Sequence, residues 1–130
     1  MISPHDKFFK EMFSKKDVAE SFLKHYLPEE LLSLVDIESL EISKNSFVDS
    51  NLKEYFSDII YKVNINNNPS YIYCLFEHKS YPDKSAAFQL LKYITKIWEL
   101  NLKQTINKKL PVILPLLIYH GQKRYTIDKN

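Results

Sequence analysis

Hydrophobic residues recur three or four positions apart over residues 4–27, a pattern that predicts two short helices, each burying one side. Residues 14–16 separate them, and Pro28 ends the second because proline cannot continue a helix. The side chains that we expect to be buried are Phe8, Phe9, Met12 and Phe13 in the first helix and Phe22, Leu23, Tyr26 and Leu27 in the second.

Residues 55–76 carry the pattern of a β-hairpin. The first half, residues 55–65, alternates between a hydrophobic face and a mixed face, as a strand does. Residues 71–76 are apolar on both faces, which is typical of a central strand, and the Asn- and Pro-rich residues 66–70 predict the turn. The pairing that aligns a fully apolar face sets Ile59 opposite Phe76, Tyr61 opposite Cys74 and Val63 opposite Ile72.

The remaining segments complete a mixed α/β arrangement. Residues 37–42 predict a weak strand, and residues 111–120 predict a last strand in which Pro115 favours an edge position. Helical spacing over residues 85–103 predicts a helix that is buried over a wide arc. Its two stripes are Ala86, Leu90, Tyr93, Ile97 and Leu100, and Phe88, Leu91, Thr95, Trp98 and Leu102. We therefore expect one domain, residues 1–130, in the order α-α-β-β-β-α-β, with a mainly antiparallel sheet flanked by helices.

Composition narrows the function classes. With 45% hydrophobic and 26% charged residues in 130, the chain has the make-up of a folded domain. A net charge of +2 leaves any nucleic-acid contact to local patches, and no apolar run is long enough to cross a membrane. The single glycine excludes a glycine-rich phosphate loop. The single cysteine, Cys74, predicts a core thiol and a reducing cytoplasm, and it excludes a zinc site of several cysteines.

Candidate chemistry lies at the end of the central strand. Glu77 and Lys79 point to one face and His78 to the other. The same hairpin pairing sets Asp58 directly opposite Glu77, where two carboxylates repel unless a cation lies beside them. Two hard oxygen ligands suit Mg²⁺, which keeps several waters and is completed by substrate phosphate. The backbone carbonyl of His78 is a candidate third ligand.

Residues beside this pair suggest phosphodiester hydrolysis. Lys79 is placed to hold or deprotonate a water, or to neutralise charge on phosphorus. On the following helix, Gln89 and Tyr93 are four residues apart and share a face. The Gln89 amide is expected to orient the water or Lys79, and Tyr93 to donate to a phosphate oxygen.

These residues resemble the core of the PD-(D/E)xK nucleases, including the helical Q-x-x-x-Y element of the RecB-like nucleases. Over nearly the whole chain, the sequence is similar to the recombination-promoting nuclease/putative transposase (Rpn, YhgA-like) family. The segments that carry this resemblance are His5-Asp6-Lys7-Phe8-Phe9-Lys10, Leu27-Pro28, Ser46-Phe47-Val48-Asp49, Ser57-Asp58-Ile59-Ile60-Tyr61-Lys62-Val63, Phe76-Glu77-His78-Lys79-Ser80 and Tyr119-His120-Gly121.

The resemblance implies a Mg²⁺- or Mn²⁺-dependent DNA endonuclease associated with recombination and mobile elements. Asp58, Glu77 and Lys79 correspond to its core triad, with Gln89 and Tyr93 as the helical element. His120 is a further candidate because its neighbours resemble a family motif. Ser57 stands where the superfamily motif has proline. Family members usually continue further, so we expect the chain to be the N-terminal nuclease core of a longer protein.

Other interpretations remain open at this stage. The chain is alternatively a catalytically inactive DNA-binding or protein-interaction module on the same fold, or a hydrolase of RNA or nucleotides. Asp58 alone would also fit a water-facing strand residue, Tyr93 a core residue, and Asp6 a first-turn acid that favours the helix N-terminus. Cutting a duplex takes two cuts, which makes a homodimer compatible with the function, although no interface is recognisable in the sequence.

Overall fold

The computed structural model describes residues 4–43, 46–48, 52–53, 55–78, 83–104 and 110–119. Its helices are α1 (Pro4–Phe13), α2 (Lys16–Tyr26), α3 (Glu29–Leu32) and α4 (Asp83–Gln104). Its strands are β1 (Val35–Ser43), β2 (Phe56–Ile65), β3 (Asn68–Glu77) and β4 (Val112–Tyr119). The predicted order of elements is confirmed, with the single turn of α3 added before the first strand.

The strands form one mixed sheet in the order β1-β2-β3-β4. β1, β2 and β3 run antiparallel, whereas β4 runs parallel to β3, because α4 carries the chain back before β4 begins. β3 thus lies between two neighbours, as its apolar pattern predicted, and β4 with Pro115 stands last in the order. None of the helices in the described part of the chain has the length and apolar character needed to span a membrane.

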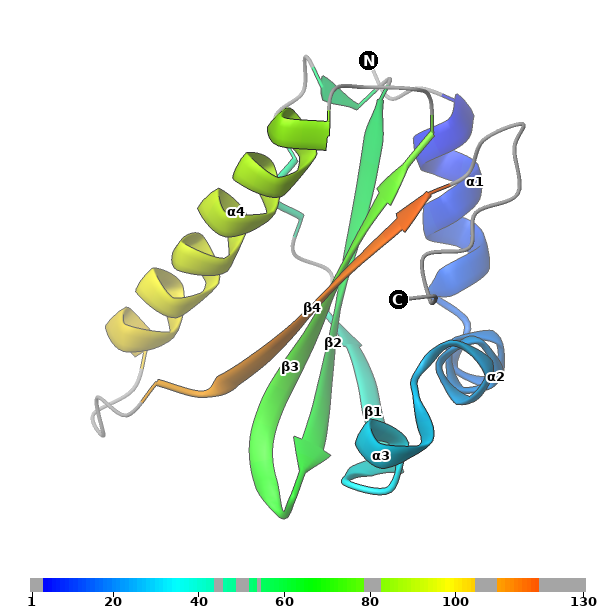
Figure 1. Cartoon of the computed structure of the whole chain (residues 1–130), viewed down its shortest axis with the longest axis vertical. Coiled ribbons are helices and arrows are strands. Elements are labelled where there is room, and N and C mark those ends of the chain that lie inside the picture. The colour runs from blue at the N-terminus through cyan, green and yellow to red at the C-terminus, as the bar shows by residue number, and fades with distance from the viewer. Residues whose placement is uncertain are drawn as a thin grey trace.

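Both faces of the sheet are covered, by α1 and α2 on one side and by α4 on the other (Figure 1). The α1/α2 cluster joins Phe9, Ala19 and Leu23 of the helices to Ile59, Tyr61, Ile72 and Cys74 of the sheet. The α4 cluster joins Tyr93 and Ile97 to Phe56, Ile60, Tyr73 and Leu75. The core position predicted for Cys74 is confirmed, and burial raises the pKa of its thiol.

Two expectations about helix burial are wrong. In α1, Phe9 is buried, but Phe8 is 64% exposed and Met12 37% exposed. In α4, the first predicted stripe holds, since Tyr93 and Ile97 are buried, whereas Phe88, Leu91 and Leu102 of the second stripe are exposed. Each helix lies against one face of a sheet, and such a contact covers one stripe of a helix rather than a wide arc.

The hairpin turn is shorter than the sequence analysis predicted. Only Asn66 and Asn67 connect β2 to β3, and both have positive φ, 53° and 65°. Positive φ at both central residues is the feature of a type I′ turn, whose twist matches that of the strands. The pairing is therefore shifted by two residues, so that Asp58 lies opposite Leu75 and Glu77 lies opposite Phe56. The predicted direct opposition of Asp58 and Glu77 is wrong, but an even shift keeps every side chain on its predicted face.

Replacing Asn67 with alanine should lower the free energy of unfolding by about 1 kcal/mol, because a Cβ without a locally bonding side chain disfavours the left-handed region. Asn67→Gly should be neutral or stabilising. Urea denaturation measures both. Asn64→Ala, an exposed position in β2, is the matched control and should cost less. An equal cost at positions 64 and 67 would contradict the turn assignment.

Candidate active site

Asp58 and Glu77 lie on the same face of two adjacent strands. The register places them two positions apart along the sheet, because the partner of Asp58 is Leu75 and Glu77 follows two residues later. Diagonal neighbours of this kind are about 7–8 Å apart at the backbone, within reach of carboxylates that share an ion. Asp58 is 0% exposed and Glu77 3% exposed, so the interpretation of Asp58 as a water-facing residue is wrong.

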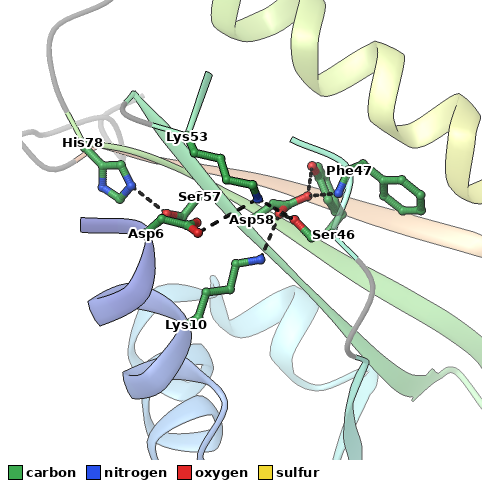
Figure 2. A network of polar contacts seen from close by, with 9 residues as sticks. Asp6, Lys10, Ser46, Phe47, Lys53, Ser57, Asp58 and His78 are labelled. Atoms are coloured by element: carbon green, nitrogen blue, oxygen red, sulfur yellow. Dashed lines mark hydrogen bonds and ion pairs between the residues drawn. The ribbon is translucent and has the colours of Figure 1, made fainter. Parts of the chain in front are cut away.

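The Asp58 carboxylate accepts contacts from four groups (Figure 2). Lys10 Nζ lies 3.3 Å from Oδ1, and the Ser46 hydroxyl donates to the same oxygen. The backbone N–H of Phe47 and the hydroxyl of Tyr73 each donate to Oδ2 at 2.8 Å. A buried carboxylate needs such donors, since an uncompensated charge away from water is costly.

The end of β1 explains how these groups reach Asp58. The described pairs between β1 and β2 end at Ser43 opposite Ile60, two residues beyond Asp58 along β2. The segment 46–48 follows β1 and supplies two of the donors. α1 is held against the opposite face of the sheet by Phe9, whose ring stacks on Phe76 with centroids 4.7 Å apart. The next residue, Lys10, reaches around the edge to Asp58.

A second lysine extends this network. Lys53 Nζ lies 3.4 Å from the Ser46 hydroxyl and 4.0 Å from Asp6 Oδ2 (Figure 2). Asp6 is only 2% exposed, although it belongs to the first turn of α1. First-turn electrostatics therefore do not explain Asp6 fully. Lys53 and the neutral hydroxyl of Ser46 link Asp6 to Asp58.

His78 lies on the side predicted for it, away from the two carboxylates. Its Nε2 is 2.6 Å from the hydroxyl of Ser57, both side chains are buried, and its ring packs edge-on against Phe76. Its backbone N–H donates to the carbonyl of Tyr55 at 2.7 Å. A proline in place of Ser57 would have no hydroxyl for this contact, so the departure from the superfamily motif has a structural use. The role of the His78 carbonyl as a ligand stays a prediction.

α4 brings Gln89 and Tyr93 over the face that carries Asp58. The Tyr93 ring packs edge-on against Tyr73, 6.1 Å between centroids, and Tyr73 donates to Asp58. Tyr93 is therefore a core residue that also supports an Asp58 donor. One helical turn before Tyr93, Oε1 of Gln89 is buried and accepts no hydrogen bond from the described residues. A buried acceptor of this kind usually has a partner, which makes Gln89 a candidate contact for a water or ligand.

Two predicted site residues, Lys79 and His120, lie outside the described residues. Their roles remain predictions from the sequence. Lys10, Ser46, Lys53 and Tyr73 were not identified by sequence reasoning. Lys10 and Ser46 do fall within segments that carry the family resemblance, which was the available signal, and Tyr73 shares the face of Glu77 by strand alternation.

The donor set fits a divalent cation of the Mg²⁺ type. Two buried carboxylates on one face supply hard oxygen ligands, and Mg²⁺ ordinarily takes one or two carboxylates and completes its shell with water and phosphate. Within the described ranges, no group of three or more His, Cys, Asp or Glu side chains is arranged to hold a metal ion. To bind such an ion, Asp58 would have to give up one of its four present contacts.

The mixed four-stranded sheet, with helices on both faces and acidic residues on β2 and at the end of β3, defines an α/β protein with a PD-(D/E)xK-like core. The model of the family described as "Putative transposase, YhgA-like" matches residues 3–130. The chain belongs to this family. No solved structure gives a significant match.

Three of the curated relatives that match the chain come from Escherichia coli K12. The chain is 38% identical to recombination-promoting nuclease RpnA over 119 residues, covering 92% of the chain and 40% of the relative. It is 35% identical over 120 residues to recombination-promoting nuclease RpnC and, with the same coverage, to the inactive recombination-promoting nuclease-like protein RpnE. The chain thus spans 40% of the length of these relatives, and their names include both nucleases and an inactive protein.

Replacing Tyr73 with phenylalanine should lower the free energy of unfolding by about 2 kcal/mol at pH 8, because it removes a buried donor from a charged acceptor. Burial, and next the charge of Asp58, raise the pKa of Tyr73 well above 10. The unfolded chain loses the Tyr73 proton near pH 10, while the folded chain keeps it. The contribution of the Tyr73 hydroxyl to the free energy of unfolding is therefore constant below pH 10 and declines above it.

Urea denaturation from pH 8 to pH 11 should therefore show the difference between wild type and Tyr73→Phe narrowing above pH 10. Tyr71→Phe, two residues earlier on the same face of β3, is the control and should cost less than about 1 kcal/mol. Equal losses of unfolding free energy at both positions would show that the hydrogen bond from Tyr73 to Asp58 adds no stability beyond that of an ordinary tyrosine hydroxyl.

Proposed function

We propose that the chain is a nuclease domain that hydrolyses DNA phosphodiester bonds with bound Mg²⁺ or Mn²⁺. The observation that carries this proposal is the pair of buried carboxylates, Asp58 and Glu77, on one face of adjacent strands. Membership of a family whose relatives include recombination-promoting nucleases supports the choice of nucleic acid as substrate. The names of the same relatives support a role of this chain in recombination.

Asp58 and Glu77 would hold the ion. A bound Mg²⁺ or Mn²⁺ would lower the pKa of the attacking water and offset negative charge on the phosphate. The Phe47 N–H and the Tyr73 hydroxyl fix one oxygen of Asp58, and this leaves the other oxygen, Oδ1, as the side that faces exchangeable partners. Rigid support of this sort keeps a ligand in one orientation.

The remaining steps fall to Gln89 and Lys79. Hydrolysis forms a bond from the water oxygen to phosphorus, breaks one phosphorus–oxygen ester bond, and moves a proton from the water toward the leaving oxygen. Oε1 of Gln89 is an acceptor suited to a proton of that water. Lys79 is proposed, from its sequence position two residues after Glu77, to supply positive charge beside the phosphate.

In a plasmid-nicking assay with Mg²⁺, the variants Asp58→Asn, Glu77→Gln and Lys79→Ala should each lose activity by a factor on the order of 100, since each removes an ion ligand or a charge that acts on the transition state. Asp36→Asn, an exposed carboxylate of β1, is the matched control and should cut at the wild-type rate. Circular dichroism confirms that the variants are folded.

Nicking that persists undiminished in the Asp58 and Lys79 variants would contradict the assignment. An inactive module is the competing function, and the name of RpnE as an inactive protein gives it support. Mn²⁺ titration calorimetry separates the two, because an inactive module without an ion site gives no heat that depends on Glu77.

Replacing Gln89 with methionine should raise the free energy of unfolding by about 1 kcal/mol, because it removes a buried acceptor that no described residue satisfies. It should also lower nicking about tenfold or more, because the water loses its acceptor. Thr95→Met, an exposed position of α4, introduces the same side chain as a control and should change neither quantity. A Gln89→Met protein that is more stable and equally active would remove Gln89 from the mechanism.

A further inference from the structure

The contacts of Asp58 leave it without a spare acceptor position. A carboxylate has about four lone-pair sites. Lys10 and Ser46 occupy Oδ1, and Phe47 and Tyr73 occupy Oδ2. A cation that binds Asp58 must therefore displace at least one of these groups, and the identity of that group determines how the site is loaded.

Two of the four groups are fixed by the fold. The Phe47 donor is a backbone N–H, and the Tyr73 side chain is 0% exposed, packed in the cluster beneath α4. Ser46 is neutral, and its hydroxyl already accepts from Lys53 at 3.4 Å while it donates to Asp58. These three groups have no electrostatic reason to leave when a cation arrives.

Lys10 differs from them in charge, reach and exposure. Its ammonium group reaches Asp58 from α1, on the end of a long side chain that is 28% exposed. Its 3.3 Å contact is longer than the two fixed contacts at 2.8 Å. A divalent cation on Oδ1 would stand next to this ammonium group, and two like charges so close repel strongly in a partly dry site.

We propose that Lys10 is a positioning residue that holds Asp58 in the ion-free protein and releases it when a divalent cation binds, so that ammonium group and cation compete for the same carboxylate oxygen. This inference rests on the proposed function, because it concerns the same ion site. In the ion-free protein, Lys10 balances the buried charge of Asp58. The cost of removing Lys10 is then part of the affinity for the ion.

Mn²⁺ titration calorimetry at fixed pH on the 130-residue chain tests this competition. Lys10→Met keeps the length of the side chain and removes the charge, and it should bind Mn²⁺ about tenfold more tightly than wild type, a factor typical of coupled sites. Lys10→Arg keeps a cation and should stay within about threefold of wild type. Lys7→Met, an exposed position of the same helix, is the matched control and should bind like wild type.

Thermal unfolding supplies a second readout that needs no nuclease activity. In EDTA, Lys10→Met should unfold at a lower temperature than Lys7→Met, because Asp58 has lost its counter-charge. Added Mn²⁺ should raise the unfolding temperature more in Lys10→Met than in wild type, because the ion replaces the missing charge and binds more tightly. If Lys10→Met does not fold, Lys10→Gln, which retains a neutral donor, repeats both measurements with the same expectations.

The outcomes separate this inference from the proposed function. If wild type binds Mn²⁺ in a manner that Asp58→Asn abolishes, and Lys10→Met binds it equally or less tightly, the competition is overturned while the ion site stands. Lower nicking by Lys10→Met at unchanged Mn²⁺ affinity would likewise overturn it and make Lys10 a substrate contact. If neither wild type nor Lys10→Met binds Mn²⁺, both the competition and the proposed function are overturned.

Discussion

The buried carboxylate of Asp58 is the constraint on which the site depends. A charge with no exposed surface costs several kcal/mol unless its surroundings compensate it. Here the compensation comes from Lys10 on α1, from Ser46 and Phe47 after β1, and from Tyr73 on β3. These segments are far apart in the sequence, so the carboxylate is satisfied only once the helix, the loop and the hairpin have come together. The candidate site and the tertiary fold therefore form as one unit.

The sequence was sufficient for the order of elements and for the faces of the central strands. Alternation in β2 and β3 places Asp58 and Glu77 on one face and His78 on the other, and this holds in the structure. The register was wrong because five turn residues were inferred from composition, whereas Asn66 and Asn67 alone make the turn by adopting positive φ. An error of one residue would have moved the acids to opposite faces, but an error of two kept the chemistry recognisable.

The donors of Asp58 could not be derived from periodicity. The position of Lys10 in the sequence is typical of a solvated helix residue, and its contact with Asp58 joins α1 to β2, a tertiary feature with no local pattern. The prediction that Phe8 and Phe88 are buried was wrong for a related reason. Spacing identifies an apolar stripe, but it does not show whether another element covers that stripe. Similarity to a family was the better guide here, because the segments around Lys10 and Ser46 belonged to the resemblance before any role for them was apparent.

Asp58 and Gln89 differ in what the fold gains from them. Asp58 connects α1, the segment 46–48 and β3. A member of this family that had lost catalysis would therefore still have a structural reason to keep an aspartate at this position. Oε1 of Gln89 makes no comparable contribution to the fold, because it is buried and accepts no hydrogen bond from the described residues. An unsatisfied buried acceptor lowers the stability of a fold. A buried acceptor that costs stability is best explained by a ligand that it meets. Gln89 is thus a more informative position than Asp58 for testing the proposed contact to an attacking water.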